Sequence, residues 1–179
     1  VAMPSTVYDM KGLLTAAIRD NNPVMYLWHK VLYDLEEEVP EGDWIVPLGE
    51  AAVRREGEDI TVVAYSLMMH RAMEAAAELD GRISVEIIDP RTLHPFDLDT
   101  VLMSLRKTGR LLVVHESPVR CGVGGDIVRR VCEAGFELLR QAPLVVGGKD
   151  SPIPFSKSLE DAVIPQVSDI RAAIEAMVG

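Results

Sequence analysis

Two short pairs of ionisable residues offer the chemistry in this chain. His29 and Lys30 directly follow the apolar run VMYLW at residues 24–28, and His115 and Glu116 end the run LLVVHE. Histidine titrates near neutral pH and can accept or donate a proton. In open α/β sheets, ligands usually bind beyond the carboxyl ends of the strands. His29 and Lys30 are the stronger pair, because they are polar groups at the mouth of an otherwise apolar element.

The second pair does not form an acid–base unit by itself. Adjacent residues on a strand point to opposite faces of the sheet, so His115 and Glu116 cannot face each other, and we interpret both as structural. Gly122 and Gly124 begin the spacing of a dinucleotide fingerprint, but Ile127 occupies the third glycine position. The glycines therefore predict a tight turn with close helix–sheet packing.

The remaining candidates favour structural roles. His94 precedes a proline and is expected in a turn, and His70 lies in a helical run and is expected in solvent. No histidines, cysteines or carboxylates have the spacing of metal ligands. Cys121 and Cys132 are eleven residues apart, which on one helix is about 16 Å, so no disulfide is expected. From the residues alone, no complete catalytic, cofactor or metal site is predicted.

Composition excludes several classes of function. The chain has 179 residues, of which 48% are hydrophobic and 26% charged, with a net charge of −10. This balance disfavours binding to nucleic acids and to anionic membranes. No apolar run approaches the roughly 20 residues that span a bilayer, and no signal peptide is visible after Val1. We expect a cytoplasmic protein.

These side chains must be positioned by alternating strands and helices. Apolar runs predict strands, and apolar residues at helical spacing predict helices. The expected strands are 60–66, 83–88, 111–115 and 143–147, and the expected helices are 69–79, 97–107, 124–134 and one that Ser168 caps. This order predicts an α/β fold: a three-layer, mostly parallel open sheet with helices on both faces.

The N-terminal part is organised differently. A helix is predicted over residues 9–20 with Asp9 as its cap, followed by a strand at 24–28 that is buried on both faces. Residues 34–43 contain six acids and no base, which predicts a solvated linker. We therefore expect three parts, at residues 1–33, 34–43 and 44–179.

Longer motifs carry a resemblance to a known family. The chain resembles the C-terminal, transketolase-C-type domain of the beta subunit of thiamine-diphosphate-dependent 2-oxo acid dehydrogenase components. The motifs are IIDPRTLHPFDLDTV, KTGRLLVVHE, GGDIVRRV and APLVVGGKDSPIPFSKSLEDAVIP, with DNNPVMYLWHKVLY upstream. Within the family, PVRCGVGGDI and SPIPFSKSLEDAVIP resemble the acetoin-dehydrogenase branch.

The resemblance implies a fragment of a larger catalytic assembly. Residues 1–33 resemble the last helix and strand of the pyrimidine-binding domain, whose cofactor glutamate has no counterpart here. Thiamine diphosphate and magnesium are expected in the full complex and not on this fragment. The expected partners are an alpha subunit, a second beta subunit in a heterotetramer, and a lipoyl acyltransferase core that docks at the C-terminal end. His29, and secondarily Lys30, are expected in the substrate channel.

Two other interpretations remain open. The chain could be a free-standing interaction module that keeps this fold without chemistry. It could also be the equivalent domain of another thiamine enzyme, such as a transketolase. The beta-subunit interpretation, by contrast, predicts an enzyme subunit that is inactive as this fragment alone. The reading frame upstream of Val1 distinguishes the two: a pyrimidine-binding domain there favours the enzyme subunit, and a start codon near Val1 favours the module.

Overall fold

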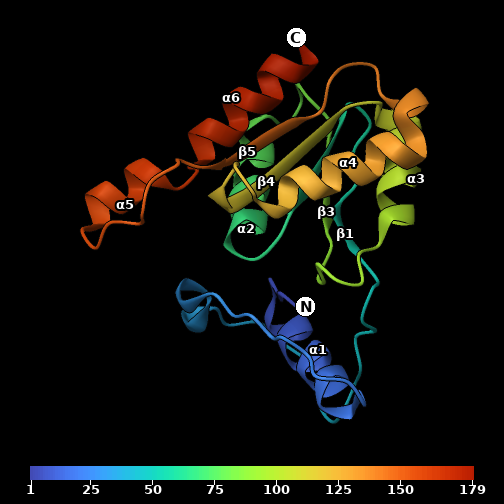
Figure 1. The fold of residues 1–179 in the computed structure, drawn as a ribbon, viewed down its shortest axis with the longest axis vertical. Coiled ribbons are helices and arrows are strands. Elements are labelled where there is room, and N and C mark those ends of the chain that lie inside the picture. Colours follow the sequence, from blue (N-terminus) through green and yellow to red (C-terminus); the bar gives the residue numbers. More distant parts are fainter.

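The computed structural model describes residues 1–179 and contains a five-stranded sheet with helices on both faces (Figure 1). The strand order is β1-β3-β2-β4-β5, with β1 antiparallel to β3 and the other pairs parallel. The strands are β1 Ala52–Arg55, β2 Ile60–Ala64, β3 Val85–Asp89, β4 Leu111–Pro118 and β5 Leu144–Gly148. The helices are α1 Val7–Arg19, α2 Leu67–Glu78, α3 Leu98–Thr108, α4 Val123–Gly135, α5 Lys157–Val163 and α6 Val167–Val178. Two short 3₁₀ helices are η1 Lys30–Asp34 and η2 Phe136–Leu138. The predicted mostly parallel α/β fold is confirmed.

The central strands form where the sequence is continuously apolar. Every residue of β2 and β3 is buried, as is expected for parallel strands covered on both faces. β2 pairs with both neighbours, with Val62 opposite Ile87 on β3 and Leu112 on β4. The edge strand β1 was not predicted, because its four residues, AVRR, include two arginines and lack a strand-like apolar run.

Each face of the sheet is covered by a different pair of helices. Helices α2 and α6 bury one face around Met68, Ala72, Ile170 and Ile174. Helices α3 and α4 bury the other face around Val101, Leu105, Ile127 and Val131. Because α6 completes one of these two cores, the C-terminal helix is structural and cannot be removed without opening the sheet to water.

Helix termini agree with the sequence in one case and differ in two. Asp97 caps α3 by accepting the N–H of Thr100 at 3.0 Å, as its type predicts. The cap of α6 is Gln166 and not Ser168, because Gln166 and Asp169 form a reciprocal capping box. The cap of α1 is Thr6 and not Asp9, because Thr6 Oγ1 accepts the N–H of Asp9 at 3.1 Å.

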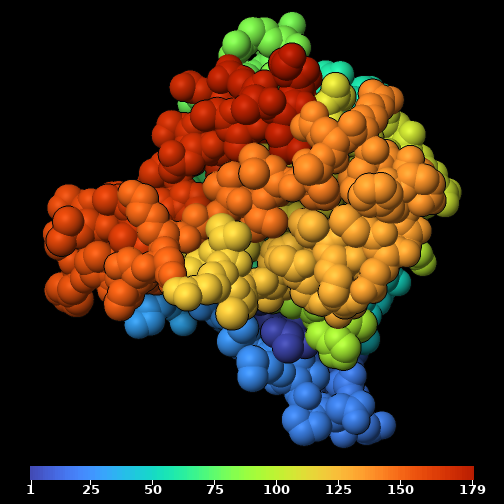
Figure 2. Space-filling model, turned by 45° about the horizontal axis from the view of Figure 1, so that its top comes forward, coloured from blue at the N-terminus to red at the C-terminus, as the bar shows by residue number.

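Helix α5 was not predicted and differs from the other helices. It has no buried residue, and it projects from the body of the molecule, as the orange segment of Figure 2 shows. The side chains of Ile153, Phe155 and Leu159 are exposed in and before it. Its apolar positions therefore do not contribute to the core of this chain.

The predicted strand at residues 24–28 is wrong. Only an isolated bridge between Ala2 and Tyr26 forms there, and Met25, Leu27 and Trp28 are exposed. A strand buried on both faces needs a layer on each side, and this segment finds only the N-terminal residues beside it. The apolar pattern predicts burial on both faces, and these side chains are exposed instead.

Beyond Asp34, the last residue of η1, the acidic run forms no helix or strand, and it lies beside α1. Glu37 accepts the N–H of Val7 at 2.9 Å, at the start of α1, where a carboxylate is favourable. Asp43 pairs with Arg19 at 3.3 Å, and Lys11 donates to the carbonyl of Gly42 at 2.7 Å. One acid of the run is thus paired with a base of α1, which the composition of the run does not indicate.

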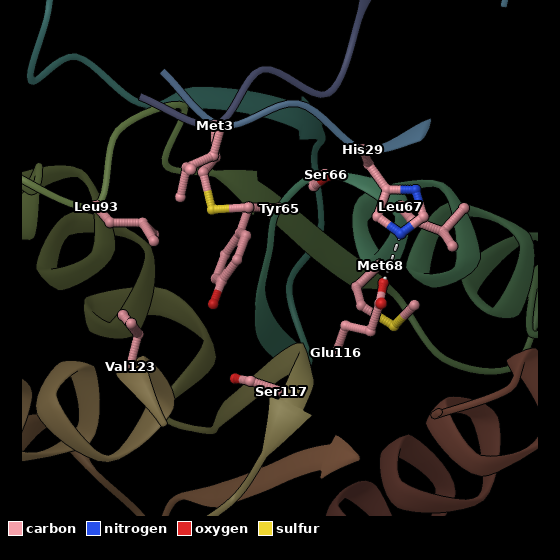
Figure 3. A pocket seen from close by; sticks show the side chains of 11 residues that line it. Met3, His29, Tyr65, Ser66, Leu67, Met68, Leu93, Glu116, Ser117 and Val123 are labelled. Atoms are coloured by element: carbon pink, nitrogen blue, oxygen red, sulfur yellow. Dashed lines mark hydrogen bonds and ion pairs between the residues drawn. The ribbon is translucent and has the colours of Figure 1, made fainter. Parts of the chain in front are cut away.

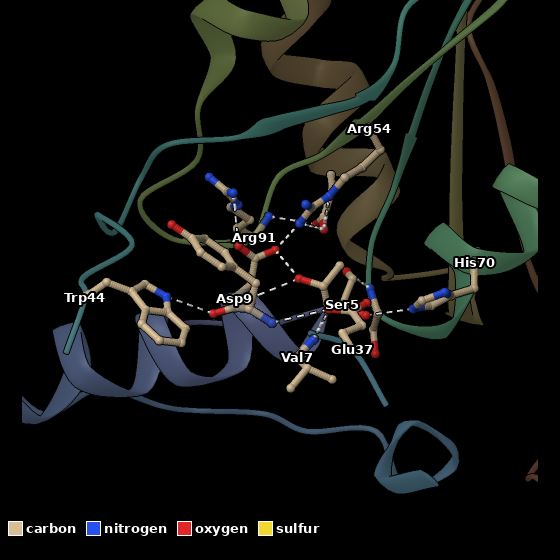
Figure 4. Close-up of polar contacts among 12 residues, drawn as sticks. Ser5, Val7, Asp9, Glu37, Trp44, Arg54, His70 and Arg91 are labelled. Atoms are coloured by element: carbon tan, nitrogen blue, oxygen red, sulfur yellow. Dashed lines mark hydrogen bonds and ion pairs between the residues drawn. The ribbon is translucent and has the colours of Figure 1, made fainter. Parts of the chain in front are cut away.

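A buried ionic cluster fastens α1 to the sheet (Figure 4). Asp9 and Asp89 are fully buried, and the guanidinium of Arg54 bonds both, with its Nη2 2.9 Å from Asp89 Oδ2. Arg91 adds a second pair with Asp9 at 3.0 Å. Buried carboxylates require such partners, because an unpaired charge in the interior is strongly unfavourable. Asp89 and Arg91, at the end of β3, therefore hold the N-terminal segment in place.

Two further observations complete the fold. No helix is long and apolar enough to cross a membrane. Both cysteines are free, as predicted, and Cys121 precedes α4 instead of lying on it.

Candidate functional site

A pocket of about 300 Å³ lies beyond the carboxyl ends of β2 and β4 (Figure 3). The chain leaves β2 for β3 on one side and reaches β4 on the other, so this is the topological switch point of the sheet. Ligands of open α/β sheets bind at such points. The lining residues are Met3, Leu27, His29, Tyr65, Ser66, Leu67, Met68, Leu93, Glu116, Ser117 and Val123.

The N-terminal segment forms one wall of this pocket. Ala2 bridges to Thr92 beyond β3, and the N–H of Ser66 donates to Ser5 Oγ at 2.7 Å beyond β2. His70, on α2, contacts the carbonyl of Ser5 at 2.6 Å. Residues 1–5 therefore run across the carboxyl ends of the strands and close one side of the switch point.

His29 and Glu116 meet at the mouth of the pocket. Nε2 of His29 lies 2.8 Å from Oε2 of Glu116. Nδ1 of His29 accepts the N–H of Val31 at 3.2 Å, because His29 is the N-cap of η1. A ring nitrogen that accepts from a backbone N–H carries no proton in the neutral imidazole, so Nε2–H donates to the carboxylate. Both ring nitrogens are thereby engaged, and the ring orientation is fixed.

The pair also sets the charge in the pocket. The hydrogen bond from His29 lowers the pKa of Glu116 below its usual range, although partial burial opposes this effect. Glu116 is therefore a carboxylate at neutral pH. It is bonded to an imidazole that the loop before η1 holds in place.

Tyr65 supplies a neutral hydroxyl to the same pocket. Burial, and next the charge of Glu116, raise the pKa of Tyr65 to about 12. The phenol is thus protonated at physiological pH and can donate a hydrogen bond. Figure 3 shows its ring directed into the space between Leu93, Val123 and Ser117.

His115 lies on the other side of β4 and is fully buried. Its Nδ1 is 2.8 Å from Ser117 Oγ, and burial lowers its pKa. A Cβ atom on Gly122 or Gly124 would come within 2.6 Å of the imidazole ring, and one on Gly147 within 2.9 Å. Glycines at these three positions therefore let α4 and β5 approach the ring closely, which agrees with a structural role for His115.

Comparison with known proteins assigns the fold to a family. The model of the family "Transketolase, C-terminal domain" matches residues 49–170. The chain belongs to this family. A solved chain described as a split-gene transketolase, in an inactive beta4 tetramer, superposes on this transketolase C-terminal domain chain with a TM-score of 0.81 and 25% sequence identity. The superposition covers 99% of this chain and 57% of that one.

Curated relatives of this transketolase C-terminal domain protein are beta subunits. The beta subunit of acetoin:2,6-dichlorophenolindophenol oxidoreductase from Cupriavidus necator is 51% identical over 97% of this chain. The beta subunit of the pyruvate dehydrogenase E1 component from Rhizobium meliloti is 44% identical over 99% of it. The predicted resemblance, including its acetoin-type branch, is confirmed. The chain spans 52% of the first relative and 39% of the second.

The structure brings together only some of the predicted site residues. His29 lines the pocket, whereas Lys30 is exposed and does not. His70 is not free in solvent as predicted, because it is half-buried against Ser5. His94 is exposed in a turn, as expected. Whether His29 faces a substrate stays a prediction.

Two pocket residues were missed as functional candidates. Glu116 was interpreted as structural because it cannot reach His115, and its partner His29 is 87 residues away in the sequence. Tyr65 follows β2 at a position that the predicted strand included. The sequence does contain a signal for both residues. Each lies where an apolar parallel strand ends, and ligand pockets of open α/β sheets form at such ends.

The glycine turn at the start of α4 does not fit the diphosphate of thiamine diphosphate. A diphosphate needs a backbone cradle or a bound cation. The glycine turn before α4 is filled by His115, and no group of three or more His, Cys, Asp or Glu side chains could hold a metal ion. We derive no catalytic step through that cofactor on this chain.

Proposed function

We propose that the chain is the C-terminal part of the beta subunit of a thiamine-diphosphate-dependent 2-oxo acid or acetoin dehydrogenase. The observation that carries the proposal is the 51% identity to an acetoin oxidoreductase beta subunit, which extends over 97% of this chain. In the complete enzyme, the cofactor and Mg²⁺ are bound by other parts of the complex. The cofactor supplies the electron sink for carbon–carbon cleavage, and the acyl group passes to a lipoyl group.

The exposed apolar residues in and after α1 support the proposal that residues 1–33 belong to a larger domain. Ile18 is 75% exposed and Met25 61% exposed, and Trp28 lies beside them in the sequence. Exposed large apolar side chains that gather in one segment support an interface there. Residues 1–33 are proposed as the end of a pyrimidine-binding domain whose other residues cover these side chains, with residues 34–43 as the linker to residues 44–179.

His29 is proposed as the substrate-facing residue of this chain. Its ring is fixed by Glu116 and by the N–H of Val31, at the mouth of the switch-point pocket. A ring held in one orientation by two hydrogen bonds can position a reacting group without further ordering cost. Lys30 has no such support and is proposed to be dispensable.

Kinetics of the complete complex tests this role. His29→Ala is expected to lower kcat/KM about tenfold through lost positioning, with Lys30→Ala as the matched control that stays within about twofold. Unchanged turnover and substrate affinity in His29→Ala would show that His29 does not face the substrate.

The assembly role concerns the C-terminal end of the chain. The proposed partners are an alpha subunit, a second beta subunit and a lipoyl acyltransferase core, in the cytoplasm. The net charge of −10 suits a basic docking domain on that core, because complementary charge speeds association. The core contacts of α6 rule out deletion as a test, so a substitution at its exposed residue Ala172 is used instead.

Binding of the complete complex to the acyltransferase tests the docking end. Ala172→Arg adds bulk and positive charge to α6 and is expected to weaken binding at least about tenfold. Met103→Arg, on the exposed face of α3, adds the same side chain elsewhere and is expected to bind normally. Equal binding of both variants would place the docking surface away from α6.

A further inference from the structure

One oxygen of the Glu116 carboxylate has no partner in the protein. Oε2 lies 2.8 Å from Nε2 of His29 (Figure 3), whereas Oε1 makes no hydrogen bond or ion pair with this chain. The Glu116 side chain lines the switch-point pocket and is 29% exposed, and Oε1 is not sealed in by the fold. A carboxylate that is partly removed from water is stabilised by each donor it gains, so the free oxygen offers a binding position to a donor from outside the chain.

The groups around Glu116 leave the pocket with a negative charge. The hydrogen bond from His29 lowers the pKa of Glu116, and the charge of Arg71 on α2 adds to this effect. His29 donates as a neutral imidazole, and Arg71 donates to the carbonyl of Pro165, so neither places a positive charge on Oε1. Tyr65 is neutral, because burial, and next the charge of Glu116, raise its pKa to about 12. The pocket therefore favours a positively charged ligand over a neutral or negative one.

The remaining wall of the pocket requires that this cation carry its own hydrocarbon. Met3, Leu27, Leu93 and Val123 present apolar side chains to a space of about 300 Å³, which is at the small end of the range for ligand sites. A metal ion such as Ca²⁺ takes about six to eight oxygen ligands, and one free carboxylate oxygen in an apolar wall does not supply them. An ammonium group needs only one carboxylate oxygen and leaves the apolar wall to the rest of the molecule.

We infer that this pocket is a binding site for a small apolar primary amine, whose ammonium group donates to Oε1 of Glu116 and whose hydrocarbon part packs against Met3, Leu27 and Leu93. Alkylammonium and cycloalkylammonium ions belong to this class, whereas 2-oxo acids and uncharged ketones do not. The inference rests on the pocket and its charge. It needs neither a cofactor nor the proposed enzyme function, and it can be tested on this chain.

Three probes that share one ring test the sign of the charge: cyclohexylamine, cyclohexanol and cyclohexanecarboxylate. The 179-residue chain with ¹³C-methyl-labelled methionine reports binding through Met3 and Met68, which line the pocket. Exposed Met25 and Met103 are the internal references, because a chain with a net charge of −10 also attracts cations to its surface.

The amine is expected to bind in the pocket and the anion is not. At about pH 8, where an alkylamine is still protonated, and at constant ionic strength, cyclohexylamine is expected to shift Met3 and Met68 saturably with a Kd of about 1 mM. Cyclohexanol is expected to bind about tenfold more weakly, because its hydroxyl lacks the charge-assisted hydrogen bond. Cyclohexanecarboxylate is expected to cause no shift of these methyl groups, because it meets like charge.

Three variants locate the charge and the hydrocarbon site. Glu116→Gln keeps the size of the side chain and is expected to weaken amine binding about tenfold while leaving cyclohexanol binding in place. Glu74→Gln removes the same charge from an exposed position of α2 outside the pocket and is expected to bind the amine normally. Leu93→Trp fills the apolar part of the pocket and is expected to abolish the binding of both ligands.

Several outcomes would overturn the inference. They are the absence of a saturable shift with the amine, binding of cyclohexanol or the carboxylate to the unmodified chain as tight as that of the amine, and undiminished amine binding in Glu116→Gln or Leu93→Trp. An equal loss in Glu74→Gln and Glu116→Gln would do the same, because it would mean that the amine responds to net charge only. If Glu116→Gln does not fold, the three probes and Leu93→Trp still decide. Because no partner, cofactor or turnover is involved, these outcomes are independent of the kinetic test of His29.

Discussion

The imidazole of His29 and the carboxylate of Glu116 lie 2.8 Å apart, although 87 residues separate them in the chain. This contact joins the segment before η1 to the carboxyl end of β4. Both residues line the pocket, so the geometry of the site depends on a pairing between two parts of the chain that the sequence places in different units.

Replacing Glu116 by glutamine tests the strength of this pairing. The amide can still accept from Nε2–H of His29, but the bond loses its charge, so we expect a loss of about 1 kcal/mol in the free energy of unfolding at pH 7. Because the pKa of Glu116 is lowered in the folded protein, its contribution is present above the unfolded-state value near 4.5 and is lost as pH falls through the folded value. Urea unfolding of both proteins from pH 7 downward measures this. A difference that persists at the lowest pH would contradict it.

Removing a cation from the buried ionic cluster should lower the free energy of unfolding more than Glu116→Gln does. Arg54→Met leaves Asp89 without its cation and removes one of the two that bond Asp9, so we expect a loss of about 3–5 kcal/mol. Arg55→Met is the matched control, because the partner of Arg55, Asp80, is 60% exposed and such pairs contribute less than about 1 kcal/mol. Chemical denaturation of the two variants compares them. Equal losses would mean that the cluster does not stabilise the docking of α1.

The central sheet could be predicted from sequence because local pattern and final burial agree there. Strands β2 and β3 are continuously apolar and fully buried, and Asp97 caps α3 through a bond to a residue three positions away. Local rules are sufficient for such elements.

The site could be predicted only in part, because its contacts join distant residues. His29 is recognised by its place after an apolar run, but the positions of its partner Glu116 and of Tyr65 depend on how β2 and β4 meet. The same limit explains Asp9, which was predicted as a helix cap and instead bonds Arg54 and Arg91. The prediction for residues 24–28 is wrong for a different reason: an apolar run indicates burial, but it does not show which residues would cover the strand, and Met25 and Trp28 are exposed.

Two adjacent glycines of α4 should respond in opposite ways to alanine. A Cβ on Gly124 would lie 2.6 Å from the His115 ring and 2.7 Å from Val145, and overpacking of this kind costs about 1–3 kcal/mol. Gly125 faces open space, so Gly125→Ala should stabilise the helix by about 0.5–1 kcal/mol. Thermal unfolding of both variants at pH 7 measures the two shifts. Similar melting temperatures would mean that α4 does not pack on His115 as described.

His115 should make the stability of the protein depend on pH near neutrality. Burial lowers its pKa below the usual 6.5, so the unfolded chain binds the proton first as the pH falls. Stability is therefore complete above pH 6.5 and is lost as pH decreases toward the folded-state pKa, with a slope of at most about 1.4 kcal/mol per pH unit. His115→Gln keeps a hydrogen-bonding group for Ser117 but does not titrate, so its stability should vary less with pH. His94→Gln, at an exposed position, is the matched control and should follow the unmodified protein. Urea unfolding of the three proteins between pH 7.5 and about 5 decides the matter: if His115→Gln loses stability in parallel with the other two, the buried imidazole is not the group that titrates.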